Sequence, residues 1–93
     1  MPDKTTQDNR NLDISIEYCV PCDFSNEALS AARELLKGHQ EEIRSVKLVP
    51  GSGGVFDVEA EGATLFSKEE KGRFPEEGEV EKAFRAITSK TAT

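Results

Sequence analysis

The feature that most constrains the fold is a change in hydrophobic period on either side of residues 19–22. Before this point, apolar residues alternate with polar ones, which predicts a strand with one buried face. The alternating residues are Leu12, Ile14, Ile16 and Tyr18. After it, apolar residues recur at helical spacing, which predicts an amphipathic helix that Gly38 is placed to end. The helical set is Phe24, Ala28, Ala31, Ala32, Leu35 and Leu36.

The remainder of the chain predicts three more strands and a second helix. A strand runs from Ile43 to Val49, and the run Pro50–Gly54 then breaks the chain. Residues 56–60 and 63–67 alternate on either side of Gly62, which predicts a hairpin. Polar residues 67–78 are expected to form a loop, and the spacing of Val80, Ala83, Phe84 and Ile87 predicts a final helix.

These elements follow the order β-α-β-β-β-α. The first strand, helix and second strand suggest a right-handed βαβ unit with parallel strands. The economical packing is an α/β fold of the two-layer α+β kind, with both helices on one face of a mixed four-stranded sheet. This is a compact thioredoxin-like topology. We expect one domain over residues 12–88, a disordered tail over 1–11 and a frayed tail over 89–93.

Charge and composition exclude some classes of function. The 93 residues carry 18 acidic and 12 basic side chains, a net charge of −6. Such a surface repels phosphate backbones, so we expect no nucleic-acid partner. No apolar stretch is long enough to span a membrane, and the N-terminal residues lack an apolar segment typical of a signal peptide. We therefore expect a cytoplasmic protein with no membrane partner.

The two cysteines, Cys19 and Cys22, enclose Val20 and Pro21 at the strand-to-helix turn. Disulfides are usually transient in the cytoplasm, and one that closes so short a loop adds little to a fold. The thiolate is the reactive form of cysteine, and the first turn of a helix favours it through unpaired N–H groups and a positive dipole end. Pro21 is tolerated in a first turn and stiffens the spacer. The pattern therefore predicts a redox-active dithiol that forms a Cys19–Cys22 disulfide.

Other chemistry at this motif has less support in the sequence. A Cys-x-x-Cys pair is also half of a zinc site, which needs two further ligands. Besides carboxylates only His39 remains, and it lies beyond the predicted helix. We assign no metal ligands, and no motif for a cofactor is present. The glycine run Gly51–Gly54 precedes a strand and lacks the lysine of a phosphate-binding loop.

Three segments resemble the Rdx family, the group of thioredoxin-fold proteins that includes selenoprotein W. They are Ile16–Cys22, which runs into the dithiol, Pro50–Val58, which opens the hairpin, and Gly72–Glu76, with its Gly-Arg-Phe-Pro element. The resemblance covers roughly residues 12–88. It implies a β-α-β-β-β-α fold and a thiol oxidoreductase activity. In relatives that contain selenocysteine, the selenium occupies the position of Cys22, so the resemblance implies that this chain is a cysteine-containing homologue of selenoproteins.

The roles of the two cysteines remain open at this stage. Cys19 is expected to lie nearer the helix tip and solvent, which favours it as the attacking thiolate and Cys22 as the resolving thiol. The selenium position favours Cys22 as the reactive centre. In either order, one thiolate attacks a disulfide and the second cysteine resolves the mixed disulfide. The partners are proteins or low-molecular-weight thiols and disulfides. The alternatives are a redox-switched protein-binding module and a metal- or sulfur-handling protein.

Residues that could bind a partner surround the dithiol in this interpretation. Thioredoxins place a cis-proline opposite their dithiol, whereas here Gly53 and Gly54 approach that position and Pro50 lies several residues earlier. The backbone that meets a substrate is then lined by glycine. Phe74 could form a hydrophobic rim near the dithiol, beside Pro21. We therefore assign partner binding to Pro21, Gly53, Gly54 and Phe74.

Overall fold

The computed structural model describes residues 12–92, with side chains to residue 87. Four strands form one sheet in the order β2-β1-β3-β4. β1 is parallel to β2 and antiparallel to β3, and β3 is antiparallel to β4. The strands are β1 (Leu12–Cys19), β2 (Ile43–Gly51), β3 (Phe56–Ala60) and β4 (Ala63–Ser67). The mixed sheet and its strand directions are as the sequence predicted.

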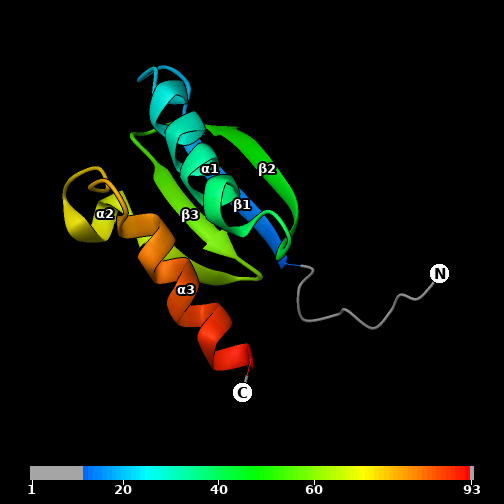
Figure 1. Ribbon diagram of the computed structural model, residues 1–93. Coiled ribbons are helices and arrows are strands. Elements are labelled where there is room, and N and C mark those ends of the chain that lie inside the picture. The colour runs from blue at the N-terminus through cyan, green and yellow to red at the C-terminus, as the bar shows by residue number, and fades with distance from the viewer. Residues whose placement is uncertain (1–11, 93) are drawn as a thin grey trace.

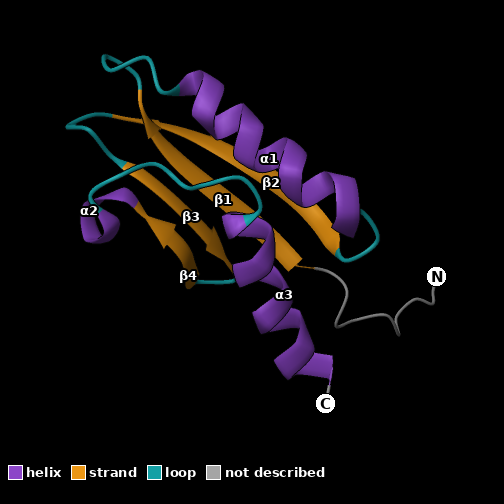
Figure 2. Ribbon diagram, turned by 60° about the vertical axis from the view of Figure 1, so that its left-hand side comes forward, coloured by secondary structure: helices purple, strands orange, loops and turns teal. Residues whose placement is uncertain are grey.

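The two long helices cover one face of this sheet (Figures 1 and 2). Helix α1 (Ser25–His39) packs on β1 and β2, and α3 (Glu79–Ala92) packs on β4 and against α1. Among the described residues, no element covers the opposite face (Figure 2). The two-layer α+β architecture is confirmed, and the core lies between the layers. Its largest fully buried side chains include Phe56, Phe66, Phe84, Ile14, Ile16 and Leu35.

The hairpin turn between β3 and β4 consists of Glu61 and Gly62, which have φ angles of 51° and 84°. Positive φ at both central residues is the geometry of a type I′ turn, whose twist matches that of the flanking strands. Gly62 adopts it without steric cost because it has no Cβ. The predicted hairpin is therefore present, and Gly62 lies in its turn as predicted.

Several predicted boundaries are wrong. Gly38 lies inside α1, which ends at His39 with Gln40 as its C-cap. β2 continues through Pro50 to Gly51, where the sequence predicted a break. It is an edge strand, so one side of its backbone has no ladder partner, and a proline without an N–H is tolerated there. Helix α3 runs to Ala92, and the predicted frayed tail over residues 89–93 stays a prediction. The predicted tail over residues 1–11 lies outside the described residues.

A short helix, α2 (Lys68–Lys71), occupies part of the segment predicted as a loop. The Ser67 hydroxyl accepts a hydrogen bond from the Glu70 N–H, and Gly72 ends the helix with φ 74°. Ser-x-x-Glu followed by glycine is a start and stop signal for a helix. The sequence therefore contained this signal, but four helical residues are too few to show an apolar period.

Helix α3 is fixed to α1 by side chains from α1. The Glu34 carboxylate accepts hydrogen bonds from the N–H groups of Gly78 and Glu81, at 3.2 and 2.9 Å. These N–H groups belong to the first turn of α3, where helices have no internal acceptors. His39 contacts Glu81 through Nε2 at 2.9 Å and Glu42 through Nδ1 at 2.6 Å. The first contact joins α1 to α3, and the second joins the end of α1 to the turn that leads into β2.

Candidate functional site

The candidate site begins at the end of the central strand β1. Cys19 is its last residue, and the Cys19 N–H donates to the Val55 carbonyl at 2.9 Å. The next N–H, of Val20, donates to the Gly51 carbonyl at 2.9 Å. The chain therefore leaves the sheet between two backbone anchors, one on β2 and one just before β3. This placement fixes where the following turn begins.

Residues 20–24 form a turn that returns the chain to α1. The Asp23 N–H donates to the Val20 carbonyl at 2.9 Å, and the Phe24 N–H donates to the Cys19 carbonyl at 3.1 Å. Pro21 is the second residue of the inner turn, a position that its fixed φ favours. Asp23 takes the left-handed conformation with φ 62°. Pro21 thus shapes a turn before the helix, where the sequence placed it in the first helical turn.

Cys19 and Cys22 are bonded as a disulfide, with their Cα atoms 5.3 Å apart. The two sulfurs lie in different environments: Cys19 is 0% exposed, whereas Cys22 is exposed. The expectation that Cys19 lies nearer solvent is therefore wrong. The physical reason is that Cys19 is still part of the central strand β1, between Gly51 and Val55, whereas Cys22 lies in the turn beyond the sheet. The predicted pairing of the two cysteines is present.

The N-terminal end of α1 follows the disulfide directly. The helix begins at Ser25, three residues after Cys22, with Phe24 as N-cap. No side chain accepts a hydrogen bond at this cap. The unpaired N–H groups and positive dipole end of the helix therefore face the turn that carries Cys22. A negative charge that develops on sulfur there is favoured.

The glycine loop, which is the run Gly51–Gly54, lies at the same end of the molecule as the disulfide (Figure 1). Gly53 and Gly54 have φ angles of 75° and 80°, which residues with a side chain rarely adopt. Gly51 lies opposite Cys19 in the β1–β2 register. A Cβ at Gly51 would lie 2.8 Å from the Glu17 carboxylate and 3.0 Å from a Val55 methyl group. Only a glycine leaves this space free beside the redox turn.

Phe74 also contacts the turn, through Phe24. The Phe24 and Phe74 rings meet edge-to-face at 4.8 Å, and Phe74 meets Phe56 in the same way at 5.5 Å. The Lys68 ammonium lies 5.6 and 5.5 Å from the Phe24 and Phe74 ring centroids. The sequence missed this role of Lys68, because Phe24 lies far from it along the chain and Phe74 is separated from it by a turn. The structure thus brings Pro21, Phe74 and the glycine loop to the disulfide end.

A surface ion pair positions Phe74. The Arg73 guanidinium donates to both carboxylate oxygens of Glu79, at 2.8 and 3.1 Å, and to the Phe74 carbonyl at 3.0 Å. Hydrogen bonds from Arg73 and from the Glu76 N–H lower the pKa of Glu79 to about 2. The same ion pair raises the pKa of Arg73. Both groups stay charged at neutral pH, so the Gly-Arg-Phe-Pro segment is fastened to the start of α3.

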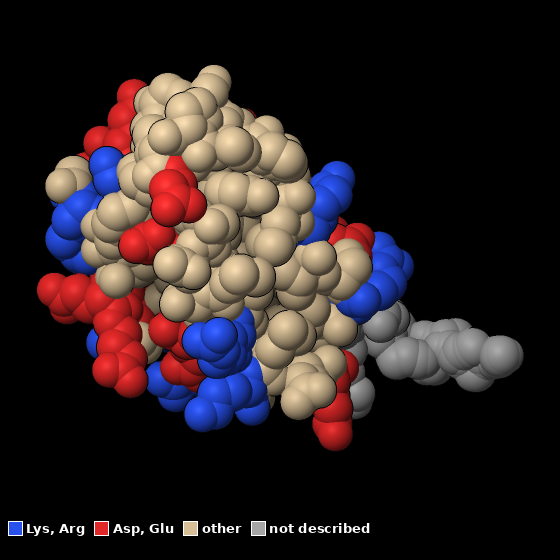
Figure 3. Space-filling view, turned by 90° about the horizontal axis from the view of Figure 1, so that it is seen from above, with Lys and Arg blue, Asp and Glu red and all other residues tan. Residues whose placement is uncertain are grey.

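The surface around the disulfide carries few charges, although 32% of the chain is charged. Residues 18–26 contain one charged side chain, Asp23, and residues 48–56 contain none. Figure 3 looks onto this end of the molecule: its middle is mainly uncharged, and basic side chains lie toward the margins. Val20 is 51% exposed and Leu48 is 36% exposed. A partner therefore meets apolar groups here, with Glu17 beside Gly51 and Lys68 over Phe24 and Phe74 as the nearby charges from other segments.

The described part of the chain contains neither a candidate metal site nor a membrane-spanning helix. Within residues 12–92 no group of three or more His, Cys, Asp or Glu side chains is arranged to hold a metal ion. In the same residues, no helix combines the length and the apolar character needed to cross a membrane. The disulfide turn is thus the feature with recognisable chemistry.

Two mammalian proteins named migration and invasion enhancer 1 are similar in sequence. The protein from Bos taurus is 36% identical over 91 residues, which are 95% of this chain and 75% of the bovine protein. The protein from Mus musculus is 37% identical over 79 residues, which are 82% of this chain and 64% of the mouse protein.

Solved structures show the same fold. A crystal structure of a protein from Bordetella parapertussis has a TM-score of 0.79 and 36% identity, covering 83% of this chain and 98% of its own. A selenoprotein W-related protein from Vibrio cholerae has a TM-score of 0.80 and 29% identity, covering 84% and 98%. The family model for the Rdx family matches residues 13–86, which contain the disulfide turn, the glycine loop and Phe74. The chain therefore belongs to the Rdx family.

Proposed function

We propose that this protein is a thiol–disulfide redox protein that exchanges electrons through Cys19 and Cys22. The observation that carries the proposal is the asymmetry of the disulfide: Cys22 is exposed in the turn, and Cys19 is buried at the end of β1. An external thiolate must reach a disulfide sulfur in order to attack it. Cys22 is therefore the point of entry, and Cys19 is the internal leaving group and resolving thiol.

The exchange begins with both cysteines of the protein reduced. The Cys22 thiolate attacks a partner disulfide, forms a bond to one partner sulfur and expels the other as a thiolate, which takes up a proton. Cys19, having lost its proton, then attacks Cys22 Sγ and releases the first partner sulfur. The partner has gained two electrons, and the protein holds the Cys19–Cys22 disulfide. This assignment reverses the order that solvent access was expected to give.

The cycle closes with a reductant of the thiol class. Two thiols, from a small molecule or another protein, reduce the Cys19–Cys22 bond and leave as a disulfide. We propose that the protein works in the cytoplasm, where thiol pools keep cysteines reduced. The backbone of the exposed Gly53 and the half-buried Gly54, together with Pro21 and Phe74, supplies the surface on which a partner docks during exchange.

Single-cysteine variants test this mechanism. In Cys19→Ser, Cys22 still attacks a peptide disulfide, but nothing resolves the product, so a stable mixed disulfide accumulates. In Cys22→Ser, the remaining thiol is buried, and we expect mixed-disulfide formation to slow by roughly a hundredfold or more. Mass spectrometry after quenching measures both products. Full exchange by both variants would exclude the mechanism, and faster trapping by Cys22→Ser would reverse the two roles.

The same turn also supports a redox-switched binding module, because Phe24 connects it to Phe74 at the surface. A catalyst and a switch differ in turnover. With excess dithiothreitol and peptide disulfide, a catalyst converts many equivalents of peptide per protein. A switch reacts once and binds its partner in only one redox state, which calorimetry on the oxidised and reduced protein would measure.

A further inference from the structure

A groove runs between α1 and the segment that enters α3. Its volume is about 450 Å³. Apolar groups from both sides form its floor, namely Ala31, Phe74, Pro75 and Val80. Carboxylates form its walls, namely Glu27, Glu34, Glu76 and Glu77, beside Asn26 and Ser30. An apolar floor between acidic walls is chemically complementary to an apolar side chain flanked by positive charge.

The negative charge of this groove is not balanced from within. Its lining contains no Lys or Arg. The nearby Arg73 is occupied by both oxygens of Glu79. The Glu34 carboxylate is satisfied by two N–H groups of the α3 region. In contrast, the side chains of Glu27 and Glu77 make no hydrogen bond or ion pair within the described residues. Their carboxylates are therefore available to pair with positive groups of a bound partner.

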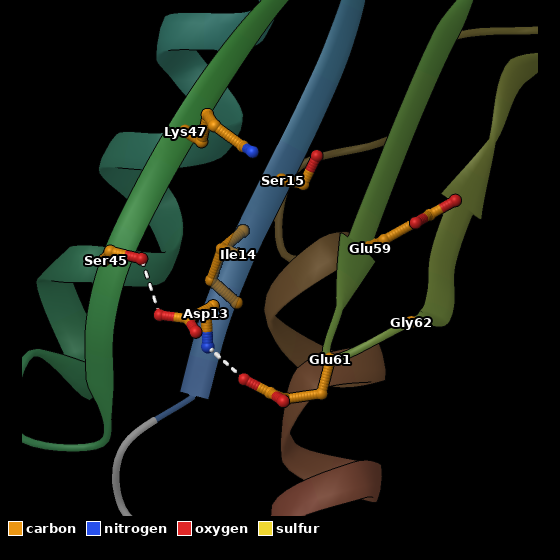
Figure 4. A pocket seen from close by; sticks show the side chains of 8 residues that line it. All are labelled: Asp13, Ile14, Ser15, Ser45, Lys47, Glu59, Glu61 and Gly62. Atoms are coloured by element: carbon orange, nitrogen blue, oxygen red, sulfur yellow. Dashed lines mark hydrogen bonds between the residues drawn. The ribbon is translucent and has the colours of Figure 1, made fainter.

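A second hollow, on the open face of the sheet, provides a contrast (Figure 4). It measures about 530 Å³ and is lined by charges of both signs, Lys47 among Asp13, Glu59 and Glu61. Asp13 is already paired, because it accepts from Arg44 Nε at 3.0 Å and from the Ser45 hydroxyl at 2.6 Å. These hydrogen bonds lower the pKa of Asp13 to about 2. This hollow therefore lacks the one-sided charge of the α1 groove.

The groove is continuous with the redox turn. Phe74 forms part of its floor and packs against Phe24, the residue at the end of the turn. Asn26 and Glu27, in its wall, belong to the first turn of α1, directly after the Cys22 segment. A peptide chain whose cysteine meets Cys22 can therefore extend into this groove with its neighbouring residues.

We propose that the groove selects protein partners in which the reacting cysteine lies close to an apolar residue flanked by Lys or Arg. The inference deepens the proposed function and rests on it, because the groove matters for exchange only if Cys22 reacts with a partner. The apolar side chain enters between Phe74 and Ala31, and the basic groups pair with Glu27 and Glu77. A partner with acidic residues in the same places is repelled.

Two synthetic peptide disulfides test the selection. Each consists of two identical peptides joined by one disulfide, with a leucine near the cysteine. The peptides differ only in carrying Lys or Glu on either side of that leucine. The reduced protein becomes oxidised at Cys19–Cys22 as it releases two peptide thiols. We expect the Lys peptide to react at least about tenfold faster than the Glu peptide at low salt, with the difference shrinking as salt is added.

Charge variants locate the effect. Glu27→Gln with Glu77→Gln should bring the two rates close together, and Glu27→Lys with Glu77→Lys should reverse the preference. The matched control is Glu41→Lys with Glu69→Lys, which changes net charge equally at two exposed side chains outside the groove. It should keep most of the preference. Reaction with a neutral small disulfide should be unchanged in all variants, and thermal melting checks that each is folded.

Failure of the groove proposal and failure of the proposed function give different results. Equal rates for the two peptides, or an equal loss of preference in the control variant, would overturn the groove. If no disulfide reacts at all, the proposed function fails, and the groove is then tested by titrating the Lys peptide with its cysteine replaced by serine. Amide shifts in nuclear magnetic resonance spectra should then gather at Ala31, Phe74 and Val80. The absence of such shifts would also overturn the groove.

Discussion

At the scale of single residues, His39 joins three parts of the chain. Its side chain is 10% exposed and lies between Glu42, in the turn after α1, and Glu81 on α3. Glu81 also pairs with Arg85 at 3.0 Å, and the His39 ring packs on Phe84 with centroids 4.8 Å apart. From the sequence, this histidine was placed beyond the predicted helix, whereas it is the last residue of α1. Its two partners lie after the helix and on another helix, so helical periodicity could not reveal them.

Protonation of His39 should stabilise the fold. Burial by itself would lower the pKa of His39, but hydrogen bonds to Glu81 and Glu42 outweigh it and raise the pKa above the ordinary 6.5. A raised folded-state pKa means stability that is fully present below the unfolded pKa and lost as pH rises through the folded one. We expect the free energy of unfolding to fall as pH rises from the ordinary histidine pKa of 6.5 through the raised folded-state pKa.

Urea unfolding across this pH range measures the effect, with His39→Gln as the control. The variant cannot gain a proton, so its stability should change less with pH than that of the natural protein. Equal pH dependence in both proteins would show that the contacts of His39 with Glu81 and Glu42 do not favour its charged form.

The two cysteines show how far the sequence determines the site. Their spacing and their position after an alternating strand identified the redox pair, because both features are local. Their exposure was predicted in the wrong order. It depends on a turn closed by the Asp23 and Phe24 N–H groups, and this turn delays the helix until Ser25. A pattern of residue types contains no information about which sulfur such a turn carries outward.

At the scale of elements, hydrophobic period predicted the long helices and all four strands. It failed where backbone hydrogen bonding decides the boundary. The Pro-Gly pair after Val49 looked like a break, yet strand pairing with Tyr18 and Cys19 continues through it. Likewise α2 depends on a serine cap and a glycine stop and buries no residue. Such features become predictable when capping signals are read beside the apolar pattern.

Two glycines allow a matched test of backbone conformation. Gly62 has φ 84°, whereas Gly38 is helical, and an added Cβ meets nothing within 4 Å at either position. Alanine at 62 must adopt a left-handed conformation, so Gly62→Ala should lower the free energy of unfolding by about 1 kcal/mol. Gly38→Ala should raise it by about 0.5 kcal/mol, since alanine loses less entropy in a helix.

Thermal melting of the two variants should therefore shift in opposite directions from the natural protein. Because neither Cβ has a neighbour, packing cannot explain such a difference. A Gly62→Ala variant as stable as the natural protein would mean that the hairpin adopts another turn.

At the scale of the whole molecule, the disulfide is a minor contributor to stability. It joins residues only 3 positions apart, so it removes little freedom from the unfolded chain. The chain-entropy relation gives about 2 kcal/mol for such a loop. The core of the two-layer fold lies elsewhere, among the buried aromatic and aliphatic side chains between sheet and helices. Both redox states should therefore share one fold.

Reduction by dithiothreitol should lower the free energy of unfolding by no more than about 2 kcal/mol and leave the protein folded at 25 °C. Urea unfolding with and without the reductant measures this difference. The Cys19→Ser, Cys22→Ser double variant should have the same free energy of unfolding as the reduced protein. Dithiothreitol should not change that value. A reduced protein that is unfolded at this temperature would make the disulfide a structural bond.

The anchoring of residues 19–24 has a consequence for the chemistry. Four backbone hydrogen bonds tie this short span to itself and to the sheet, so the sulfur that meets a partner has little freedom to lose. Bringing two reactants together normally costs entropy, and a reactant already held in position spares much of that cost. In this protein the scaffold is preorganised, and the motion needed for each exchange falls mainly to the incoming molecule.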